Sequence, residues 1–300
     1  MERIKAHDRV KHSTELVYLN LSLILISSSG LLGRLVSLSP ELTILYRCVL
    51  AAALLFIYLR YKKIKPLRTK LIYPKYLLLG GVLMAIHWVG YFYALGLSSI
   101  AIAMLTLHTH PAITSILEPI ILKTRFKSYH LLLAGVVLLG IWFIMPEFNI
   151  KNKLVLAIIC GIVSALSFSL RNIWTRKIMP HYNASQIMFY NLVVMVIILF
   201  PFVFIQDSSA IRTDWSYIVA LAVFTTAIGH TLFVNALKHF SASTVSLLSS
   251  IIPIYGIIWG VLFLSEVPDK NTIIGGLLIL SSFVIESYIS QRKIKQLQNA

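Results

Sequence analysis

Acidic residues are scarce in this sequence. Its 300 residues include 11 Asp and Glu against 27 Lys and Arg, and the four charged types together make up only 13% of the chain. Soluble domains carry about 25% charged residues. Hydrophobic residues reach 58% and the mean hydropathy is +0.82. This composition excludes an ordinary soluble protein and predicts one that crosses the membrane many times.

Cysteine pairs, metal motifs and catalytic motifs are also lacking. The two cysteines, Cys48 and Cys160, both lie in apolar runs, so we interpret them as small buried residues. The sequence has no H-E-x-x-H, no G-x-S-x-G and no P-loop. His108 and His110 are a poor metal pair, because side chains two apart diverge on a helix. We therefore expect no metal, no cofactor and no nucleotide-driven step.

Long apolar runs fill most of the chain. A helix that spans a bilayer needs about 20 apolar residues, and no stretch between the runs is long enough for a soluble domain. The stretch Met1–Lys11 is polar and the first run is too long for a signal core, so we expect no cleavable signal peptide. The sequence predicts an all-α polytopic membrane protein with ten transmembrane helices. They are 16–36, 41–60, 75–95, 100–122, 129–146, 153–174, 185–206, 215–235, 242–264 and 271–289.

Positive charge gathers in alternate connections between these spans. With the N-terminus inside, the inside segments hold 21 Lys and Arg and the outside loops hold four. Such asymmetry sets membrane orientation, so we expect a multi-pass protein of the plasma (inner) membrane with both termini cytoplasmic. The net charge of +16 is thereby explained without nucleic acid. The basic loop 60–70 is interpreted as a topology anchor beside anionic lipid.

One long stretch occurs twice in the chain. An offset of 142 aligns Ala94 with Ala236 and Pro111 with Pro253, with seven identities in 29 positions. Each copy has a turn, an apolar run with a central proline, a polar break and a Gly-containing run. We therefore predict two five-helix repeats, at 1–150 and 151–300. Because five is odd, the second repeat enters from the opposite side, and inverted repeats are typical of transporters.

The second copy carries a family resemblance. Its sequence PIYGIIWGVLFLSEVPDKNTIIGGLLIL combines the mid-helix Pro253, the acidic Glu266 at the helix end and a glycine pair that opens the last helix. It resembles the C-terminal signature of EamA-type transporters of the drug/metabolite transporter (DMT) superfamily. The resemblance covers about 16–289 and implies export of amino acids, related metabolites or drugs. The first copy departs from the pattern, because Thr124 stands where an acid is expected and Glu118 lies six residues earlier.

Polar residues near the middle of the spans are the candidates for a substrate site, because polar groups inside a membrane tend to face an interior cavity. We interpret them as a cavity lining. The alternative is that they only form hydrogen bonds and packing contacts between helices. Trp and Tyr offer apolar surface with a polar handle, while His and Ser donate or accept hydrogen bonds. The lining has no acid at mid-depth, which favours a neutral, zwitterionic or anionic solute with an apolar part over a polycation. The candidates are His87, Trp88, Tyr91, His108 and Ser250.

Charged residues inside the spans have open roles. Arg47 resembles an arginine common at this point of the family's first repeat, and it could attract a carboxylate. Arg34 and Arg171 lie near helix ends and are interpreted as snorkelling to the interface. Glu118 could pair with a cation, carry a coupled proton or reach the headgroups. His110 is a second candidate for proton coupling, since histidine titrates near neutral pH.

Two prolines at equivalent places of the repeats, Pro111 and Pro253, are the candidate gating hinges. A proline inside a helix removes a backbone hydrogen bond and kinks or breaks it. We expect the spans at 100–122 and 242–264 to bend or loosen there.

Three functions fit these patterns. The first is a secondary transporter, an exporter of an amino acid-like or drug-like metabolite that works by alternating access. The second is an intramembrane enzyme acting on lipid, against which the inverted repeat argues, and the third is a helical scaffold or receptor. For the transporter, the expected partners are a small-molecule substrate, membrane lipid and protons as a coupling ion, in a monomer or homodimer. Substrate identity, transport direction, coupling ion and oligomeric state do not follow from the sequence.

Overall fold

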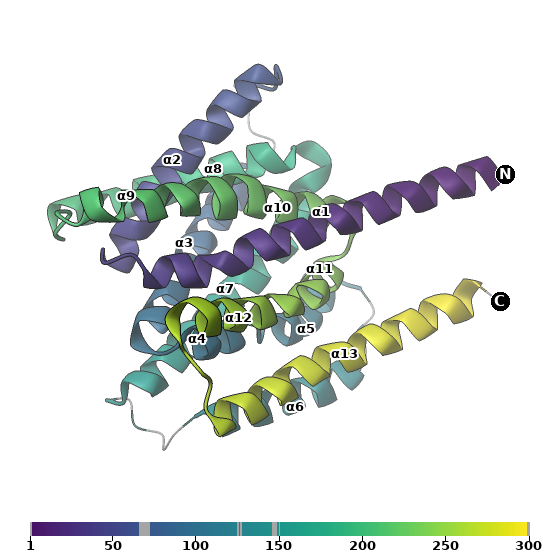
Figure 1. Cartoon of the computed structure of the whole chain (residues 1–300). Helices are drawn as coiled ribbons and strands as arrows, with labels where there is room; N and C mark the ends of the chain where they lie inside the picture. The colour runs from purple at the N-terminus through teal and green to yellow at the C-terminus, as the bar shows by residue number, and fades with distance from the viewer. Residues whose placement is uncertain are drawn as a thin grey trace. The chain divides into compact units, whose positions relative to one another are not determined.

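The protein is entirely helical in the part of the chain that its structure describes. The computed structural model describes the backbone of residues 2–65, 73–124, 126, 128–145, 149 and 151–298. Side chains are described from 14 onward and, at the other end, up to 289 apart from 283, 286 and 287. All regular structure in these ranges is helical (Figure 1), which confirms the predicted all-α class.

The chain forms two compact units, and each takes segments from both halves of the sequence. Unit 1 comprises Met1–Ala85 and Trp174–Ser241, and unit 2 comprises Ile86–Ile173 and Ala242–Ala300. The predicted repeats are contiguous in sequence, whereas these units are not. Helix α3 (Pro74–Leu97) begins in unit 1 and ends in unit 2, and α7 (Lys153–Ile178) does the reverse.

Unit 1 is built mainly from the first two helices and from the helices of 179–239. In this unit α2 packs on α8, and α1 packs on the π-helix η3 and on α10. Its elements, besides the parts of α3 and α7, are α1 (Glu2–Arg34), α2 (Pro40–Tyr61), η1 (Met179–His181), α8 (Ala184–Leu199), η2 (Phe200–Phe204), α9 (Ile211–Ala220), η3 (Leu221–His230) and α10 (Thr231–His239).

Unit 2 holds the helices that contain the repeated stretch. In this unit α6 packs along α13, α4 on α12, and α5 on α11. Its elements, besides the parts of α3 and α7, are α4 (Ile100–Leu107), α5 (His110–Leu122), α6 (Tyr129–Ile144), α11 (Ala242–Leu248), η4 (Ser249–Ile251), α12 (Ile252–Leu264) and α13 (Lys270–Gln298).

Helices occupy all ten predicted spans. Within the described residues, eight helical segments are long and apolar enough to cross a membrane: Thr14–Arg34, Pro40–Tyr61, Pro74–Leu97, Ile100–Leu122, Lys153–His181, Ala184–Phe204, Ile211–His239 and Ala242–Leu264. The predicted span 129–146 corresponds to the shorter apolar helix α6, and 271–289 lies within α13. Helices α1 and α13 extend beyond their predicted spans, because apolar runs mark the part of a helix that lies in lipid and not its ends.

Local chemistry explains several helix boundaries. Ser39 caps α2 by accepting a hydrogen bond from the Leu42 amide, and Pro40 follows in the first turn, where its missing N–H costs nothing. Ser99 caps α4 in the same way through the amide of Ile102. A capping box between Asn183 and Gln186 opens α8.

The internal repeat is visible in the backbone. Helix α5 and helix α12 have the same length and the same offset of 142 as the sequence repeat. Each ends on a non-glycine residue in the left-handed region, Lys123 at φ 54° and Ser265 at φ 57°. Two such residues at equivalent positions indicate that both copies end their central helix by the same backbone turn.

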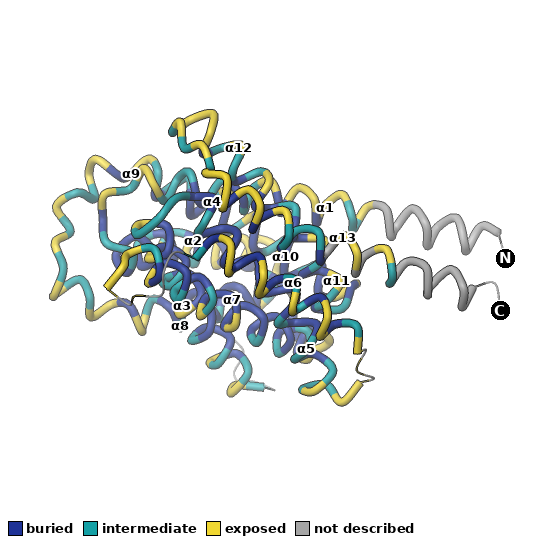
Figure 2. Tube along the Cα trace, turned by 90° about the horizontal axis from the view of Figure 1, so that it is seen from below, coloured by how far each residue is buried: buried dark blue, intermediate teal, exposed yellow. Residues whose placement is uncertain are grey.

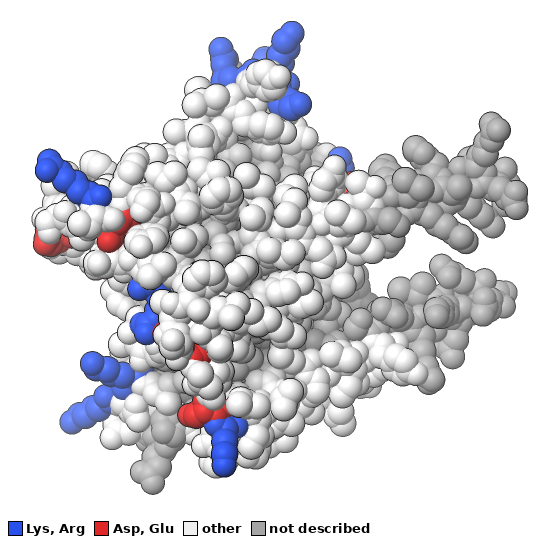
Figure 3. All heavy atoms as spheres, viewed as in Figure 1, with Lys and Arg blue, Asp and Glu red and all other residues white. Residues whose placement is uncertain are grey.

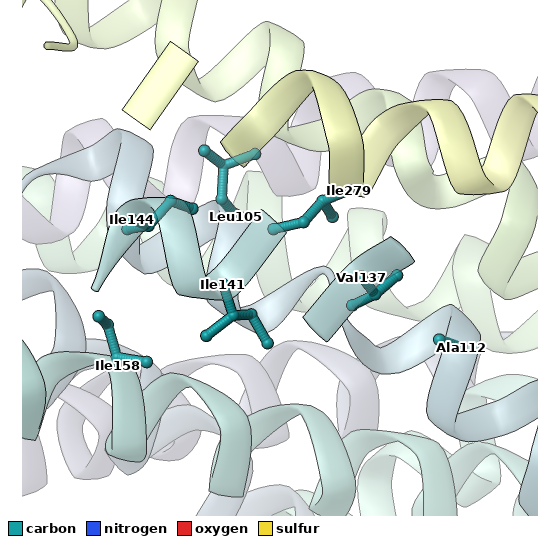
Figure 4. Packing of buried hydrophobic residues seen from close by; sticks show 7 residues of the cluster. All are labelled: Leu105, Ala112, Val137, Ile141, Ile144, Ile158 and Ile279. Atoms are coloured by element: carbon teal, nitrogen blue, oxygen red, sulfur yellow. The ribbon is translucent and has the colours of Figure 1, made fainter. Parts of the chain in front are cut away.

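The surface is largely apolar, as lipid contact requires. Large hydrophobic side chains such as Leu132, Trp142 and Leu262 are exposed. Most of the described surface in view carries no charge, and Lys and Arg gather over the end of α2 (Figure 3). Close packing in unit 2 relies on small residues, since Gly140 on α6 lies against Gly275 on α13. Unit 2 also holds a cluster of seven buried apolar residues (Figure 4), in which Ile279 lies beside Gly140 and Ile144 beside Gly275.

Candidate functional site

The structure buries every candidate substrate residue named from the sequence. His87, Trp88, Tyr91 and His108 are each at most 4% exposed, and Ser250 is 8% exposed. All five belong to unit 2, so one compact body carries them. Substrate binding by these residues stays a prediction, and the contacts of their side chains are the evidence on which it rests.

The span 100–122 is interrupted where the polar residues cluster. Helix α4 ends at Leu107, and His108 and Thr109 are not helical before α5 begins at His110 with Pro111 in its first turn. The span 242–264 is interrupted in the same way, because α11 ends, a 3-10 turn follows, and α12 begins with Pro253 in its first turn. Both spans are thus interrupted just before their prolines, while the hinge and gating role of Pro111 and Pro253 stays a prediction.

The interruption brings His108 and His110 together. Their ring centroids lie 5.2 Å apart. The Nδ1 atom of His108 lies 2.8 Å from the Met104 carbonyl oxygen. The Nε2 atom of His110 lies 3.4 Å from the Ser249 hydroxyl. The offset of 142 makes Ser250 the repeat counterpart of His108, and the serine that contacts His110 is the neighbouring Ser249.

Helix α7 links two of the histidines. The ring of Phe168 stacks on His87 at 4.4 Å between centroids and contacts the edge of His110 at 4.9 Å. The hydroxyl of Ser169 donates to the His110 carbonyl at 3.0 Å. Phe168 thus lies between the histidine of α3 and the histidine pair, which makes one connected cluster.

His87 is held in one orientation. Its Nδ1 atom lies 2.7 Å from the Ser164 hydroxyl, and that hydroxyl donates to the His87 carbonyl at 2.7 Å. Since the hydroxyl has a single proton, Nδ1 of His87 must be the donor in the first bond. Gly90, one turn along α3, lies against the backbone of Cys160. This close approach of α3 and α7 positions the ring.

Trp88 and Tyr91 complete the predicted lining on α3. Both are almost fully buried, and the Tyr91 ring contacts Phe92 edge-on at 5.8 Å. Their large rings supply the apolar part of the candidate site.

Helix α7 carries several buried polar residues, and the sequence placed one of them wrongly. Arg171 is fully buried, so its interpretation as a residue that snorkels to the interface is wrong. Its Nη1 donates to the side-chain oxygen of Asn172 at 3.1 Å, and Asn172 is also fully buried. The stretch from Ser167 to Thr175 contains no exposed residue; Figure 2 draws buried positions of the chain in dark blue. A charged residue inside an apolar run was the available signal, because such residues tend to face the protein interior.

Glu118 has a defined structural role. Its carboxylate accepts hydrogen bonds from the amides of Ala242 and Ser243, at 3.0 and 2.9 Å, and from the Ser243 hydroxyl. These donors form the start of α11. Of the alternatives left open for Glu118, this geometry favours a structural role, and proton coupling stays a prediction.

Glu266 makes the reciprocal contact. Its carboxylate accepts a hydrogen bond from the Ile100 amide at 2.8 Å, at the start of α4. Ile100 and Ala242 are equivalent under the offset of 142, so each repeat supplies an acid that caps the same helix of the other repeat. The acid expected at Thr124 is therefore replaced by Glu118, which reaches the equivalent amide from one to two turns earlier on its helix.

Arg47 lies in unit 1 and is 1% exposed. Its Nε donates to the Thr226 hydroxyl at 3.0 Å, and its Nη2 donates to the hydroxyls of Thr225 and Thr226 at 2.8 and 2.7 Å. Both threonines belong to the π-helix η3, and such helices often occur at functional sites. Arg47 is thus an interior residue, and its attraction for a substrate carboxylate stays a prediction.

The remaining sequence interpretations concern metals and thiols. Among the described residues, no group of three His, Cys, Asp or Glu side chains is arranged to hold a metal ion. Cys48 is buried and Cys160 is partly buried, and neither forms a disulfide.

Known proteins resemble this chain in sequence and in fold. The EamA-like transporter family model matches residues 14–145 and 155–288. The pseudopaline exporter CntI of Pseudomonas aeruginosa (strain UCBPP-PA14) is 30% identical over 205 residues, which are 68% of this chain and 72% of that protein. An uncharacterized transporter of Archaeoglobus fulgidus is 25% identical over 195 residues, 65% of this chain and 70% of that protein.

A solved crystal structure has the same fold. It superposes with a TM-score of 0.72 over 93% of this chain and 98% of its own, at 17% identity. A sequence identity this low supports a shared fold and nothing further. The family match covers most of the chain in two successive copies, which agrees with the repeat seen in the sequence and the backbone. The protein belongs to the EamA-like transporter family.

Proposed function

We propose that the protein is a secondary transporter that exports a small amino acid-like or drug-like metabolite across the plasma membrane by alternating access. The observation that carries this proposal is the pair of interrupted helices in unit 2. Both breaks occur at equivalent prolines, and buried polar side chains lie beside them. Broken helices that present polar groups at mid-depth are typical of transporter sites.

The rival enzymatic function is not retained. The chain belongs to a family of transporters, and the protein is not an enzyme. The relatives named pseudopaline exporters support the export direction.

The proposed substrate site in unit 2 comprises His87, Trp88, Tyr91, His108 and Ser250. Arg47 of unit 1 is proposed separately as a residue that attracts a substrate carboxylate. The stacked contact of His87 and Phe168 and the burial of Trp88 support an apolar cavity wall with polar handles. Such a lining suits a neutral, zwitterionic or anionic solute with an apolar part.

Alternating access requires two related gates. We assign them to two inverted five-helix repeats, 1–150 and 151–300, with Pro111 and Pro253 as hinges. The reciprocal caps of Glu118 and Glu266 support this assignment, because each repeat fixes the start of the other's broken helix. The excess of Lys and Arg in alternate loops supports cytoplasmic termini.

Solute counterflow in proteoliposomes tests the proposed function. The solute is first selected by a thermal-shift screen of the purified protein against a metabolite panel that includes pseudopaline, since ligands of the folded state raise its apparent stability. A labelled solute should accumulate transiently against unlabelled solute inside the vesicles. If every solute that stabilises the protein fails to exchange, the transporter proposal is wrong.

A further inference from the structure

At the break between α4 and α5, two buried histidine nitrogens lack a hydrogen-bond partner among the described residues. They are Nε2 of His108 and Nδ1 of His110, in side chains 2% and 1% exposed. Leaving a buried polar atom unpaired costs free energy, and native proteins retain such atoms for an identifiable reason. The chemical character of these two atoms follows from the partners of the other ring nitrogens.

The His108 ring carries its proton on Nδ1. That atom lies 2.8 Å from the carbonyl oxygen of Met104, and a carbonyl oxygen can only accept a hydrogen bond. In the neutral ring, Nε2 is then an acceptor with an open lone pair. This tautomer follows from the hydrogen bond alone.

The His110 ring carries its proton on the opposite nitrogen. Its Nε2 lies 3.4 Å from the Ser249 hydroxyl, and that hydroxyl donates its only proton to the Ser246 carbonyl at 2.7 Å. The Ser249 oxygen can therefore only accept from His110. Nδ1 of His110 is left as an acceptor with an open lone pair.

The two open lone pairs occur at one place in the fold. The ring centroids lie 5.2 Å apart, at the break between α4 and α5. Opposite tautomers are needed to leave both nitrogens as acceptors at these positions. The site therefore offers two acceptors, and it lacks a ring N–H to serve a carboxylate.

We propose that this histidine pair accepts hydrogen bonds from a protonated amine of the transported solute. The inference rests on the proposed function and narrows its substrate class to solutes with an amine. An ammonium group carries three N–H donors, so one group can serve two acceptors. A hydroxyl has one proton and serves only one of them, and a carboxylate has none and is repelled by both lone pairs.

The first test measures the tautomers. The protein is labelled with ¹⁵N-histidine, and its nitrogen resonances are assigned with two single variants. His108→Asn keeps an N–H donor toward Met104 and removes the ring acceptor Nε2, while His110→Gln keeps an N–H donor toward Ser249 and removes the ring acceptor Nδ1. We expect an Nδ1–H tautomer for His108 and an Nε2–H tautomer for His110. The reverse tautomer at either ring overturns the inference.

The second test measures recognition of the amine. Phenylalanine, N-acetylphenylalanine and 3-phenylpropanoate share an apolar ring and a carboxylate, and only the first carries an amine. These three probes, and any solute found by counterflow with its N-acetylated form, are bound to the full-length protein in detergent. The amine form should bind about tenfold more tightly or better, as loss of a hydrogen bond to a charged group predicts.

The variants connect this preference to the histidines. His108→Asn and His110→Gln should each remove most of the preference for the amine form over its N-acetylated form while leaving the melting temperature unchanged. Equal binding of amine and N-acetylated forms by the wild type overturns the inference, as does a preference that survives both variants. Counterflow of an amine-bearing solute at full rate in both variants would contradict this inference and leave the transporter proposal intact. Absence of counterflow for every solute contradicts the transporter proposal itself.

Discussion

Removal of the Glu118 carboxylate should destabilise the protein more than removal of its counterpart Glu266. Glu118 is 7% exposed and accepts three hydrogen bonds at the start of α11. Glu118→Ala would leave two backbone amides and a hydroxyl without this acceptor. A lost helix cap costs about 1 kcal/mol, and a buried unsatisfied donor costs about 1–3 kcal/mol. We expect a total loss of about 2–4 kcal/mol.

The matched control is Glu266→Ala. Glu266 is partly exposed and accepts a hydrogen bond from one amide of α4, so its loss should cost about 1 kcal/mol, the value of a single cap. The assay compares apparent melting temperatures of the purified variants in one detergent at one heating rate, because unfolding of such proteins is often irreversible. Glu118→Ala should melt well below Glu266→Ala, which should melt slightly below the wild type.

The same experiment separates capping from proton coupling. If Glu118 acts as a helix cap, Glu118→Gln should also melt at a lower temperature than the wild type. Its side-chain amide would place N–H donors opposite backbone N–H donors. If Glu118→Gln melts like the wild type while the pH dependence of transport disappears, the carboxylate is a coupling group and the capping argument fails.

Three further predictions concern hinges, topology and a surface cap. Pro253→Ala should let α11 and α12 join into a straighter helix, and transport should slow while melting is unchanged or later; full transport with a straight helix would remove the hinge from the account. Reporter fusions after residues 70, 150, 210 and 295 should read in, out, out and in, and an odd number of crossings between the termini would contradict the inverted repeat. Asp269 accepts from the Thr272 amide at 2.6 Å, which holds the pKa of its carboxyl below the usual value. Its cap should therefore contribute about 1 kcal/mol to the free energy of unfolding at pH values above the ordinary pKa, and this contribution should be lost as the pH falls through the lowered pKa. The melting temperature of Asp269→Asn should lack that pH-dependent step.

Much of the fold was predictable because its determinants are local. Apolar run length defines the spans, and Pro111 and Pro253 stand at the start of helices that resume after a break. The partly correct prediction for Glu118 shows the limit. An acid inside a span was visible, but its partners Ala242 and Ser243 lie 124 and 125 residues away, and a single sequence does not reveal such pairings.

The candidate site was less predictable for the same reason. The residue types on α3 and α4 pointed to an interior position, and burial agrees. The contact of His110 with Phe168 and Ser169 depends on how α7 is rotated about its axis, which periodicity did not reveal. The snorkelling interpretation of Arg171 failed because nearness to a predicted span end is a poor guide when the helix continues to Ile178.

The central claim is that buried residues beside the broken helices of unit 2 bind and move the solute. Counterflow of a validated solute by Trp88→Ala and His108→Ala, reconstituted at equal density, tests it most directly. The control is Trp142→Ala, because the Trp142 side chain is 74% exposed whereas that of Trp88 is 2% exposed. We predict that both site variants lose counterflow while they still fold and insert, and that Trp142→Ala retains it. Wild-type counterflow rates in both site variants would contradict the account and show that these residues serve only in packing.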